Sequence, residues 1–185
     1  MRELTVHAKP TNNKAKKLYF LLLGIAALDV ITYILLRNLG IPKSGLVGVF
    51  AVVLITAAVF IYTKYVGPRY YYEITADSYG TPVFVVRQEN GKRATTLLRI
   101  SLSDIARLDR ESAAGRKAHT TPYGVRKYFY IPTLYPSITY RMTVSSRYEK
   151  AEVIIEITDE LADFLRREIS EAKALALANS EEEDY

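Results

Sequence analysis

Two long apolar runs near the N-terminus constrain the fold of this chain more than any other feature. Residues 18–36 are apolar except for Asp29, one threonine and two tyrosines, and residues 46–62 contain no charged side chain. An α-helix rises about 1.5 Å per residue, so helices of this length cross a hydrocarbon core of roughly 30 Å. The sequence therefore predicts two transmembrane helices, over about residues 18–37 and 46–66.

The connector between the runs, RNLGIPKSG at residues 37–45, is too short to hold a domain. The two helices are therefore expected to form a tight hairpin, residues 18–66, which puts both chain ends on one side of the membrane. The basic N-terminal tail, residues 1–17, together with Lys64 and Arg69, outweighs the two cations of the connector. The positive-inside rule then places both termini in the cytoplasm of a multi-pass protein of the plasma membrane. A cleaved signal peptide is the alternative, but the first run is longer than a usual signal h-region and no small-x-small site follows it.

Asp29 is an acidic residue near the middle of the first predicted helix. The same depth in the second helix falls near Thr56, so we expect a protonated Asp29 to bond to Thr56 or to the same residue of a neighbouring chain. Intramembrane acids also mark ion and proton pathways. An oligomeric transport or channel component with Asp29 in its pathway is therefore the alternative function.

Tyrosines and an arginine follow the second apolar run. Tyr65, Arg69, Tyr70 and Tyr71 are residue types that settle in the headgroup zone of a membrane, and we interpret them as an interfacial collar. A ligand cage is the alternative interpretation. Much of the net charge of +5 also lies beside the predicted helices, where cations meet anionic lipid. We therefore expect membrane lipids, and no nucleic acid, as partners.

The remaining composition offers little for catalysis. The chain has no cysteine, which excludes disulfides, thiol catalysis and cysteine metal sites. Its two histidines, His7 and His119, stand apart from clustered acids and lack metal-ligand spacing, and no glycine-rich phosphate motif is present. An enzyme would need a buried cluster of ionisable groups that this pattern does not supply. We expect no enzymatic activity, no metal, no cofactor and no small-molecule substrate.

From Tyr70 onward the apolar period changes from that of a helix to that of a strand. Tyr70, Tyr72 and Ile74 fall on one face of an extended segment. Asn90-Gly91 between two strand-like runs predicts a two-residue hairpin turn. Clean alternation in residues 138–144 and again from 151 predicts two strands with one buried face each. About seven short strands are expected in all.

A C-terminal amphipathic helix follows the strands. Thr158 is a natural N-cap, and Leu161, Leu165 and Ile169 share one face of the helix. Residues 70–178 are thus predicted to form one domain, in which a strongly bent antiparallel sheet is capped by the helix. The acidic residues 179–185 are expected to form a disordered tail.

Several of these residues resemble the bacterial pleckstrin-homology-like (PH-like) domain of small membrane proteins that begin with a two-helix hairpin. The similarity lies in Tyr72-Glu73-Ile74-Thr75, in the spaced Ile100, Leu102 and Ile105, and in the closing ITDELADFLRREI helix. The resemblance implies an α+β fold. Eukaryotic relatives hold inositol phosphates with basic residues around the loop between the first two strands. Here that loop, residues 76–82, has no lysine or arginine, so the resemblance implies no phosphoinositide site.

Basic and aromatic residues gather between residues 107 and 130. A domain tethered to a membrane can press such a segment against anionic lipid, at about 1 kcal/mol per cation. Binding of a protein partner and a flexible, solvated loop are the alternatives, and a recognition helix for nucleic acid is missing. The candidate lipid- or partner-binding loop comprises Arg107, Arg110, Arg116, Lys117, Arg126, Lys127 and Tyr128.

Together these features predict a non-enzymatic integral membrane protein. It would present a cytoplasmic PH-like domain to a protein partner or to the membrane surface, in a scaffolding or regulatory role. A homo-oligomer is a further possible assembly, because Asp29 lacks a basic partner at its depth.

Overall fold

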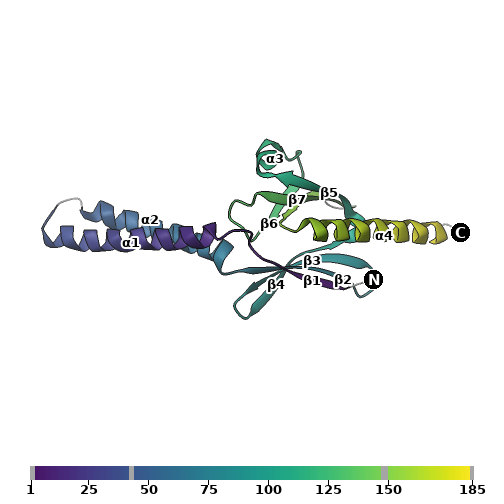
Figure 1. Ribbon diagram of the computed structural model, residues 1–185, viewed down its shortest axis with the longest axis horizontal. Helices are drawn as coiled ribbons and strands as arrows, with labels where there is room; N and C mark the ends of the chain where they lie inside the picture. The colour runs from purple at the N-terminus through teal and green to yellow at the C-terminus, as the bar shows by residue number, and fades with distance from the viewer. Residues whose placement is uncertain (1–2, 42–43, 147–149, 184–185) are drawn as a thin grey trace. The chain divides into compact units, whose positions relative to one another are not determined.

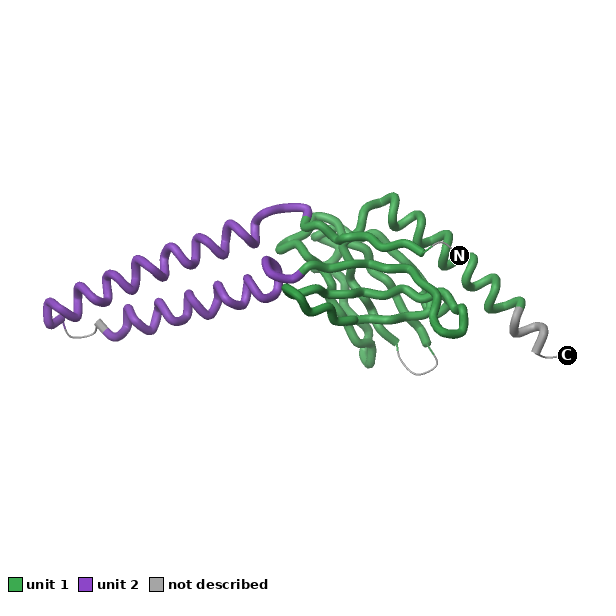
Figure 2. Tube along the Cα trace, turned by 90° about the horizontal axis from the view of Figure 1, so that it is seen from below, with its two compact units in different colours: residues 1–10, 69–185 green, residues 11–68 purple. Residues whose placement is uncertain are grey.

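The computed structural model describes residues 3–41, 44–146 and 150–183. Its chain divides into two compact units, coloured separately in Figure 2. The helical unit comprises Thr11–Pro68, and the sheet unit comprises Met1–Pro10 together with Arg69–Tyr185.

The helical unit contains the two predicted apolar helices. Helix α1 spans Lys14–Asn38, helix α2 spans Ser44–Ile61, and a π-helical turn, η1, continues over Tyr62–Val66. Both helices are long and apolar enough to cross a membrane. Most of their large apolar side chains are exposed, including Phe20, Leu28 and Val49, which distinguishes them from helices in the core of a soluble protein.

Small residues bring the two helices together. Ala26 of α1 and Ala51 and Ala58 of α2 are almost fully buried. Gly48 faces the ring of Tyr33, because a Cβ added there would lie 3.5 Å from Tyr33 Cδ2. Gly48, Ala51 and Ala58 recur at helical spacing and so form one face of α2, which permits close packing between the helices.

The sheet unit contains two sheets over the described residues (Figure 1). The first is antiparallel, in the order β1-β2-β3-β4, and the second has the order β5-β7-β8-β6 with β6 parallel to β8. Their bounds are β1 Leu4–Ala8, β2 Arg69–Ala76, β3 Pro82–Asn90, β4 Arg93–Ser101, β5 Ile105–Ser112, β6 Arg126–Tyr130, β7 Ile138–Ser145 and β8 Lys150–Ile155. The α+β class is confirmed. Two sheets of four strands replace the single sheet of about seven, because the 3₁₀ turn η2 (Leu102–Asp104) interrupts the chain after β4.

The eighth strand comes from residues predicted to be a basic tail. Strand β1 pairs antiparallel with β2, with Val6 opposite Tyr72 and Ala8 opposite Tyr70. Ala8 is buried, and Leu4 packs against the core. The prediction of a tail over residues 1–17 therefore needs correction: residues 4–8 are a strand and α1 begins at Lys14. The sequence pattern that indicates strand β1 is the short alternation of Leu4, Val6 and Ala8. It stands next to the lysines on which the prediction of a tail was based.

Helix α4, Asp159–Glu183, runs along the sheet unit and begins as predicted. The Leu161 N–H donates to Thr158 Oγ1 at 3.3 Å, which caps the helix. The helix extends into the segment predicted to be a disordered tail, because alanine, leucine, lysine and glutamate over the preceding turns are strong helix formers. Residues 184–185 lie outside the described residues.

The core of the sheet unit lies between the two sheets and α4. Phe84 and Val86 of the first sheet meet Met142 and Val153 of the second, and Leu165 of α4 enters the same cluster. Helix α3, Ala113–Ala118, lies outside this core and follows β5 (Figure 1).

Candidate functional site

The predicted basic segment is divided among three elements rather than forming one loop. Arg107 and Arg110 lie on β5, Arg116 and Lys117 on α3, and Arg126, Lys127 and Tyr128 on β6. Their roles differ, because some side chains are held inside the unit and others face outward.

Arg116 attaches α3 to the second sheet. Its Nη1 donates to Thr139 Oγ1 at 2.6 Å, and its Nη2 donates to the carbonyl oxygen of Pro136. Thr139 is fully buried on β7. Arg116 is therefore engaged in contacts inside the sheet unit.

His119 attaches the next stretch to β8. Its Nε2 lies 2.8 Å from Glu152 Oε1, and the Thr121 hydroxyl donates to Glu152 Oε2 at 3.1 Å. Glu152 is only 5% exposed. Two side chains of this stretch, His119 and Thr121, thus contact Glu152 of the second sheet, which the alternative of a flexible, solvated loop does not include. His119 and Glu152 lie far apart in sequence and no local pattern pairs them.

The remaining cations lie at the surface. Arg110 Nε is 3.3 Å from Asp159 Oδ1 and Arg107 pairs with Asp109, both in exposed ion pairs of small energetic value. Lys117 is exposed, and Lys127 Nζ lies 5.4 Å from the centre of the Phe129 ring. Phe129 is half exposed and Tyr123 fully exposed, and Lys127 with Phe129 is the cation–ring contact among them that the described residues show.

Tyr128 points away from Lys127, because alternate residues of a strand face opposite sides. Its ring stacks on Tyr130 with centroids 6.3 Å apart, and the Tyr130 hydroxyl donates to the Leu97 carbonyl at 3.3 Å. Burial raises the pKa of Tyr130. These rings line a groove of about 290 Å³ between β4 and β6, which we call the edge groove. The sequence missed it because its two walls come from distant strands.

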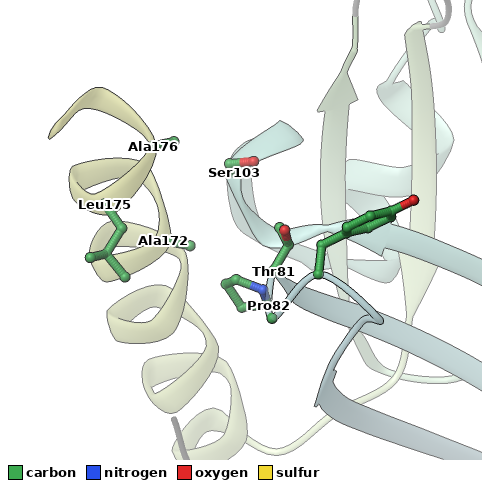
Figure 3. A pocket seen from close by; sticks show the side chains of 8 residues that line it. Thr81, Pro82, Ser103, Ala172, Leu175 and Ala176 are labelled. Atoms are coloured by element: carbon green, nitrogen blue, oxygen red, sulfur yellow. The ribbon is translucent and has the colours of Figure 1, made fainter. Parts of the chain in front are cut away.

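A second hollow, also of about 290 Å³, lies between the β2–β3 turn, η2 and α4 (Figure 3). Ala172 and Ala176 of α4 face Thr81, Pro82 and Ser103 across it. Its described lining contains hydroxyl groups and apolar surface but no charged side chain.

Two buried acids of the sheet unit, Glu156 and Glu111, have polar partners inside the unit. Glu156 accepts from the Thr133 N–H at 3.2 Å and from its hydroxyl at 2.7 Å, and Arg141 donates to Glu111. Among the described residues no three histidine, cysteine or acidic side chains come together as a metal site. Glu111 Oε2 and Arg141 Nε are buried and have no hydrogen-bond partner among the described residues.

Tyr72 joins the two sheets at the centre of this unit. Its hydroxyl donates to the Tyr130 carbonyl at 2.7 Å and accepts from the Glu156 N–H at 3.3 Å. Burial raises the pKa of Tyr72 well above its ordinary value of 10.0. The YEIT strand therefore contributes an internal hydrogen-bonding residue.

The predicted interfacial collar is divided between the units. Tyr65 lies in η1, where the Lys64 ammonium is 5.5 Å from its ring centre. Tyr71 lies beside the His7 ring at 5.0 Å, and Arg69 is exposed at the start of β2. Tyr70 needs correction, because it is 7% exposed and belongs to the core of the sheet unit. It is on the inner face of β2, as its alternation with Tyr71 requires.

Asp29 and Thr56 do not form the predicted hydrogen bond in the described chain. The Thr56 hydroxyl donates to the Val52 carbonyl at 2.9 Å, inside its own helix. This back-bonding is a usual alternative for a helical threonine. Asp29 Oδ2 is buried and has no hydrogen-bond partner among the described residues.

No protein-family profile, curated protein or solved structure matches this chain.

Proposed function

We propose that the chain is a non-enzymatic integral membrane protein. In this proposal the α1–α2 hairpin anchors a cytoplasmic PH-like domain, which binds a protein partner or the membrane surface. The observation that carries the proposal is the division into a helical unit with an apolar exterior and a sheet unit with its own core.

The exposed apolar side chains of the helices support the anchor. Burying apolar surface contributes about 25 cal/mol per Å², so helices lined by leucine, valine and phenylalanine are poorly suited to water. The short segment between α1 and α2 suits a hairpin that crosses a bilayer twice. The positive-inside rule supports cytoplasmic termini.

The sheet unit supports a binding role. Two sheets closed by a C-terminal helix suit the PH-like architecture that the resemblance implies. The surface near Lys117, Tyr123, Lys127 and Phe129 combines cations with aromatic rings, a composition that favours anionic lipid. The edge groove offers a separate surface for a protein.

Single-cysteine labelling tests the topology, because the chain has no cysteine of its own. We expect a membrane-impermeant maleimide to label Asn38→Cys, at the end of α1, in intact cells. Tyr79→Cys, on the exposed β2–β3 turn, should react only after the membrane is opened. The reverse labelling pattern would contradict the orientation, and release of the protein by alkaline carbonate would contradict the anchor.

Crosslinking followed by pull-down from native membranes tests the binding role. Arg99→Glu changes the edge groove and leaves Lys117, Lys127 and Phe129 intact. Loss of a stable protein partner in this variant places binding at the edge groove. Loss with Lys117→Glu and Lys127→Glu places it on the aromatic and basic surface. Capture that is unchanged by both sets places the partner elsewhere on the protein. Capture of no partner, together with equal affinity for anionic and neutral vesicles, would refute the binding role.

A transport or channel component is the second candidate, favoured by Asp29 Oδ2, which is buried without a hydrogen-bond partner in the described part of the chain. Oligomerisation would be needed, because two helices enclose no path. We expect Asp29→Asn to abolish proton flux in liposomes, whereas Thr56→Val, which removes only an intrahelical bond, leaves it unchanged. Equal flux from the wild-type and Asp29→Asn proteins would refute this candidate.

A further inference from the structure

The strand register of the first sheet shows which residues share each of its two ends. Strand β1 ends at Ala8, opposite Tyr70 near the start of β2. Arg69, the first residue of β2, is opposite Glu89 near the end of β3, and the β3–β4 turn follows directly. These segments therefore lie at one end of the sheet, which we call the connector end and which comprises residues 8–10, 69–70 and 88–94.

The connector end is basic. Its four cations are exposed, and Glu89 is its one acid among the described residues. None of the four cations takes part in an ion pair within the described part of the chain. They are Lys9, Arg69, Lys92 and Arg93. Their charge is therefore available to a ligand outside the sheet unit.

The opposite end of the first sheet, residues 3–4, 76–82 and 101–104, is acidic. Its described side chains include three acids and no lysine or arginine. The acids are Glu3, Asp77 and Asp104. The first sheet is thus polarised along its strands, with positive charge at the connector end and negative charge at the other.

Both chain segments that lead to the helical unit leave the first sheet at the connector end. Five residues separate Ala8 from Lys14, and two separate Val66 from Arg69. Two connecting residues span at most about 11 Å between the flanking Cα atoms. This length is close to the Debye length of about 10 Å at 0.1 M salt, so a charge held within it is only partly screened from the surface where the second helix ends.

From the charge of the connector end and the length of the connectors we propose that this end docks on anionic phospholipid headgroups, at the surface where the hairpin leaves the membrane. Arg69, Lys92 and Arg93 contact the phosphates, and the acidic end of the sheet faces away from the membrane. Opposite charge favours this orientation and like charge disfavours the reverse. The inference rests on the proposed membrane anchor and names the lipid-binding surface of the sheet unit.

The test places a fluorescent bimane label at either end of the first sheet, in the full-length protein in nanodiscs. Asn90→Cys lies at the exposed β3–β4 turn and Tyr79→Cys at the exposed β2–β3 turn, and the chain has no cysteine of its own. Lipids with a nitroxide headgroup quench a label that reaches the surface. We expect phosphatidylglycerol to increase quenching at residue 90 but not at residue 79, and about 0.5 M salt to remove the increase. Equal quenching at both positions, or no increase with phosphatidylglycerol, would overturn the proposal.

Matched charge reversals locate the surface. Lys92→Glu with Arg93→Glu changes the connector end, and Lys117→Glu with Lys127→Glu makes the same change in net charge on α3 and β6. A cation near an anionic surface is worth about fivefold in the ratio of docked to undocked molecules, so the first pair should lower this ratio at least about 25-fold. The second pair should leave quenching at residue 90 unchanged. Equal loss in both variants, or loss in the second alone, would refute the surface, and unchanged hydrogen exchange of the β7 and β8 amides shows that the variants are folded.

Failure of this surface and failure of the proposed function are separable. If phosphatidylglycerol leaves residue 90 unquenched but protects the amides around Lys117 and Lys127 from exchange, the connector-end proposal fails and lipid binding stands. If reversal of Lys92 and Arg93 abolishes capture of a protein partner and not the response to phosphatidylglycerol, the connector end binds protein and the proposal fails. If labelling of Asn38→Cys contradicts the anchor, both fail.

Discussion

Each of the two units contains a buried carboxylate oxygen, and the surroundings of the two differ. Glu156, in the sheet unit, accepts two hydrogen bonds from Thr133, at 3.2 and 2.7 Å. Asp29, in α1, has a buried Oδ2 without a hydrogen-bond partner among the described residues. The threonine predicted to serve it, Thr56, donates to Val52 of its own helix.

The difference concerns how each unit satisfies its buried carboxylates. Burying an unpaired polar group costs several times more than the net gain from an ordinary hydrogen bond, so a unit folded in water must satisfy its own carboxylates. The sheet unit satisfies Glu156 and Glu152 with Thr133, Thr121 and His119. Its Glu111 has one buried oxygen, Oε2, without a hydrogen-bond partner among the described residues, but the other oxygen is ion-paired with Arg141. In the helical unit Asp29 Oδ2 has no hydrogen-bond partner among the described residues, which is why this residue carries the second candidate function.

The largest expected effect concerns where the sheet unit begins. Residues 69–185 alone lack β1, whereas residues 1–10 joined to 69–185 by a short Gly/Ser linker keep it. Ala8 lies opposite Tyr70, so a short linker can join the two ends. Loss of the strand bonds and of the contacts of Leu4 and Ala8 should lower the free energy of unfolding by roughly 3 kcal/mol.

Urea unfolding followed by tyrosine circular dichroism measures this difference. A third fragment, with residues 1–10 replaced by Gly/Ser of equal length, controls for the linker. Equal urea midpoints for all three fragments would show that β1 is not part of the unit.

The next effect contrasts the two carboxylates directly. Glu156→Ala leaves the Thr133 N–H and hydroxyl buried without their acceptor, which should destabilise the sheet unit by about 3 kcal/mol. Hydrogen exchange of the β7 and β8 amides in the full-length protein measures the loss. Asp29→Ala and Glu160→Gln, an exposed change on α4, should leave this exchange unaltered. Equal acceleration by Asp29→Ala would end the distinction between the units.

A smaller effect depends on pH. The pKa of Tyr72 is raised in the folded protein by burial, so above the ordinary value of 10.0 the unfolded chain loses a proton that the folded chain keeps. Stability is therefore complete below pH 10 and falls as the pH rises above it, by at most about 1.4 kcal/mol per pH unit for one group. Tyr72→Phe should reduce this slope.

Urea midpoints of the linked fragment at about pH 8 and pH 10.5 measure this slope. Tyr123→Phe, at a fully exposed position, is the matched control and should keep the wild-type slope. A wild-type slope in Tyr72→Phe would assign the pH dependence elsewhere, for example to Tyr140, whose pKa is also raised by burial and by its bond to Asp159.

The smallest effect concerns the N-cap of α4. Thr158→Ala removes the acceptor for the Leu161 N–H and should cost about 1 kcal/mol, whereas Thr158→Ser should restore most of it. Hydrogen exchange in the first turn of α4 reports the change. Exchange that is the same in all three proteins would show that the cap does not stabilise the helix.

Local patterns in the sequence were sufficient for part of this structure. Apolar runs of membrane-spanning length predict α1 and α2, strict alternation predicts β7 and β8, and Thr158 predicts the start of α4, because each signal depends on residues close together in the chain. Tertiary contacts decided the rest. Strand β1 forms because Val6 lies opposite Tyr72. Arg116 and His119 are held against the second sheet because they bond to Thr139 and Glu152. The edge groove exists because β4 and β6 are the outermost described strands of two different sheets. Such contacts join residues far apart in sequence, and no local periodicity encodes which distant partners the folded chain brings together.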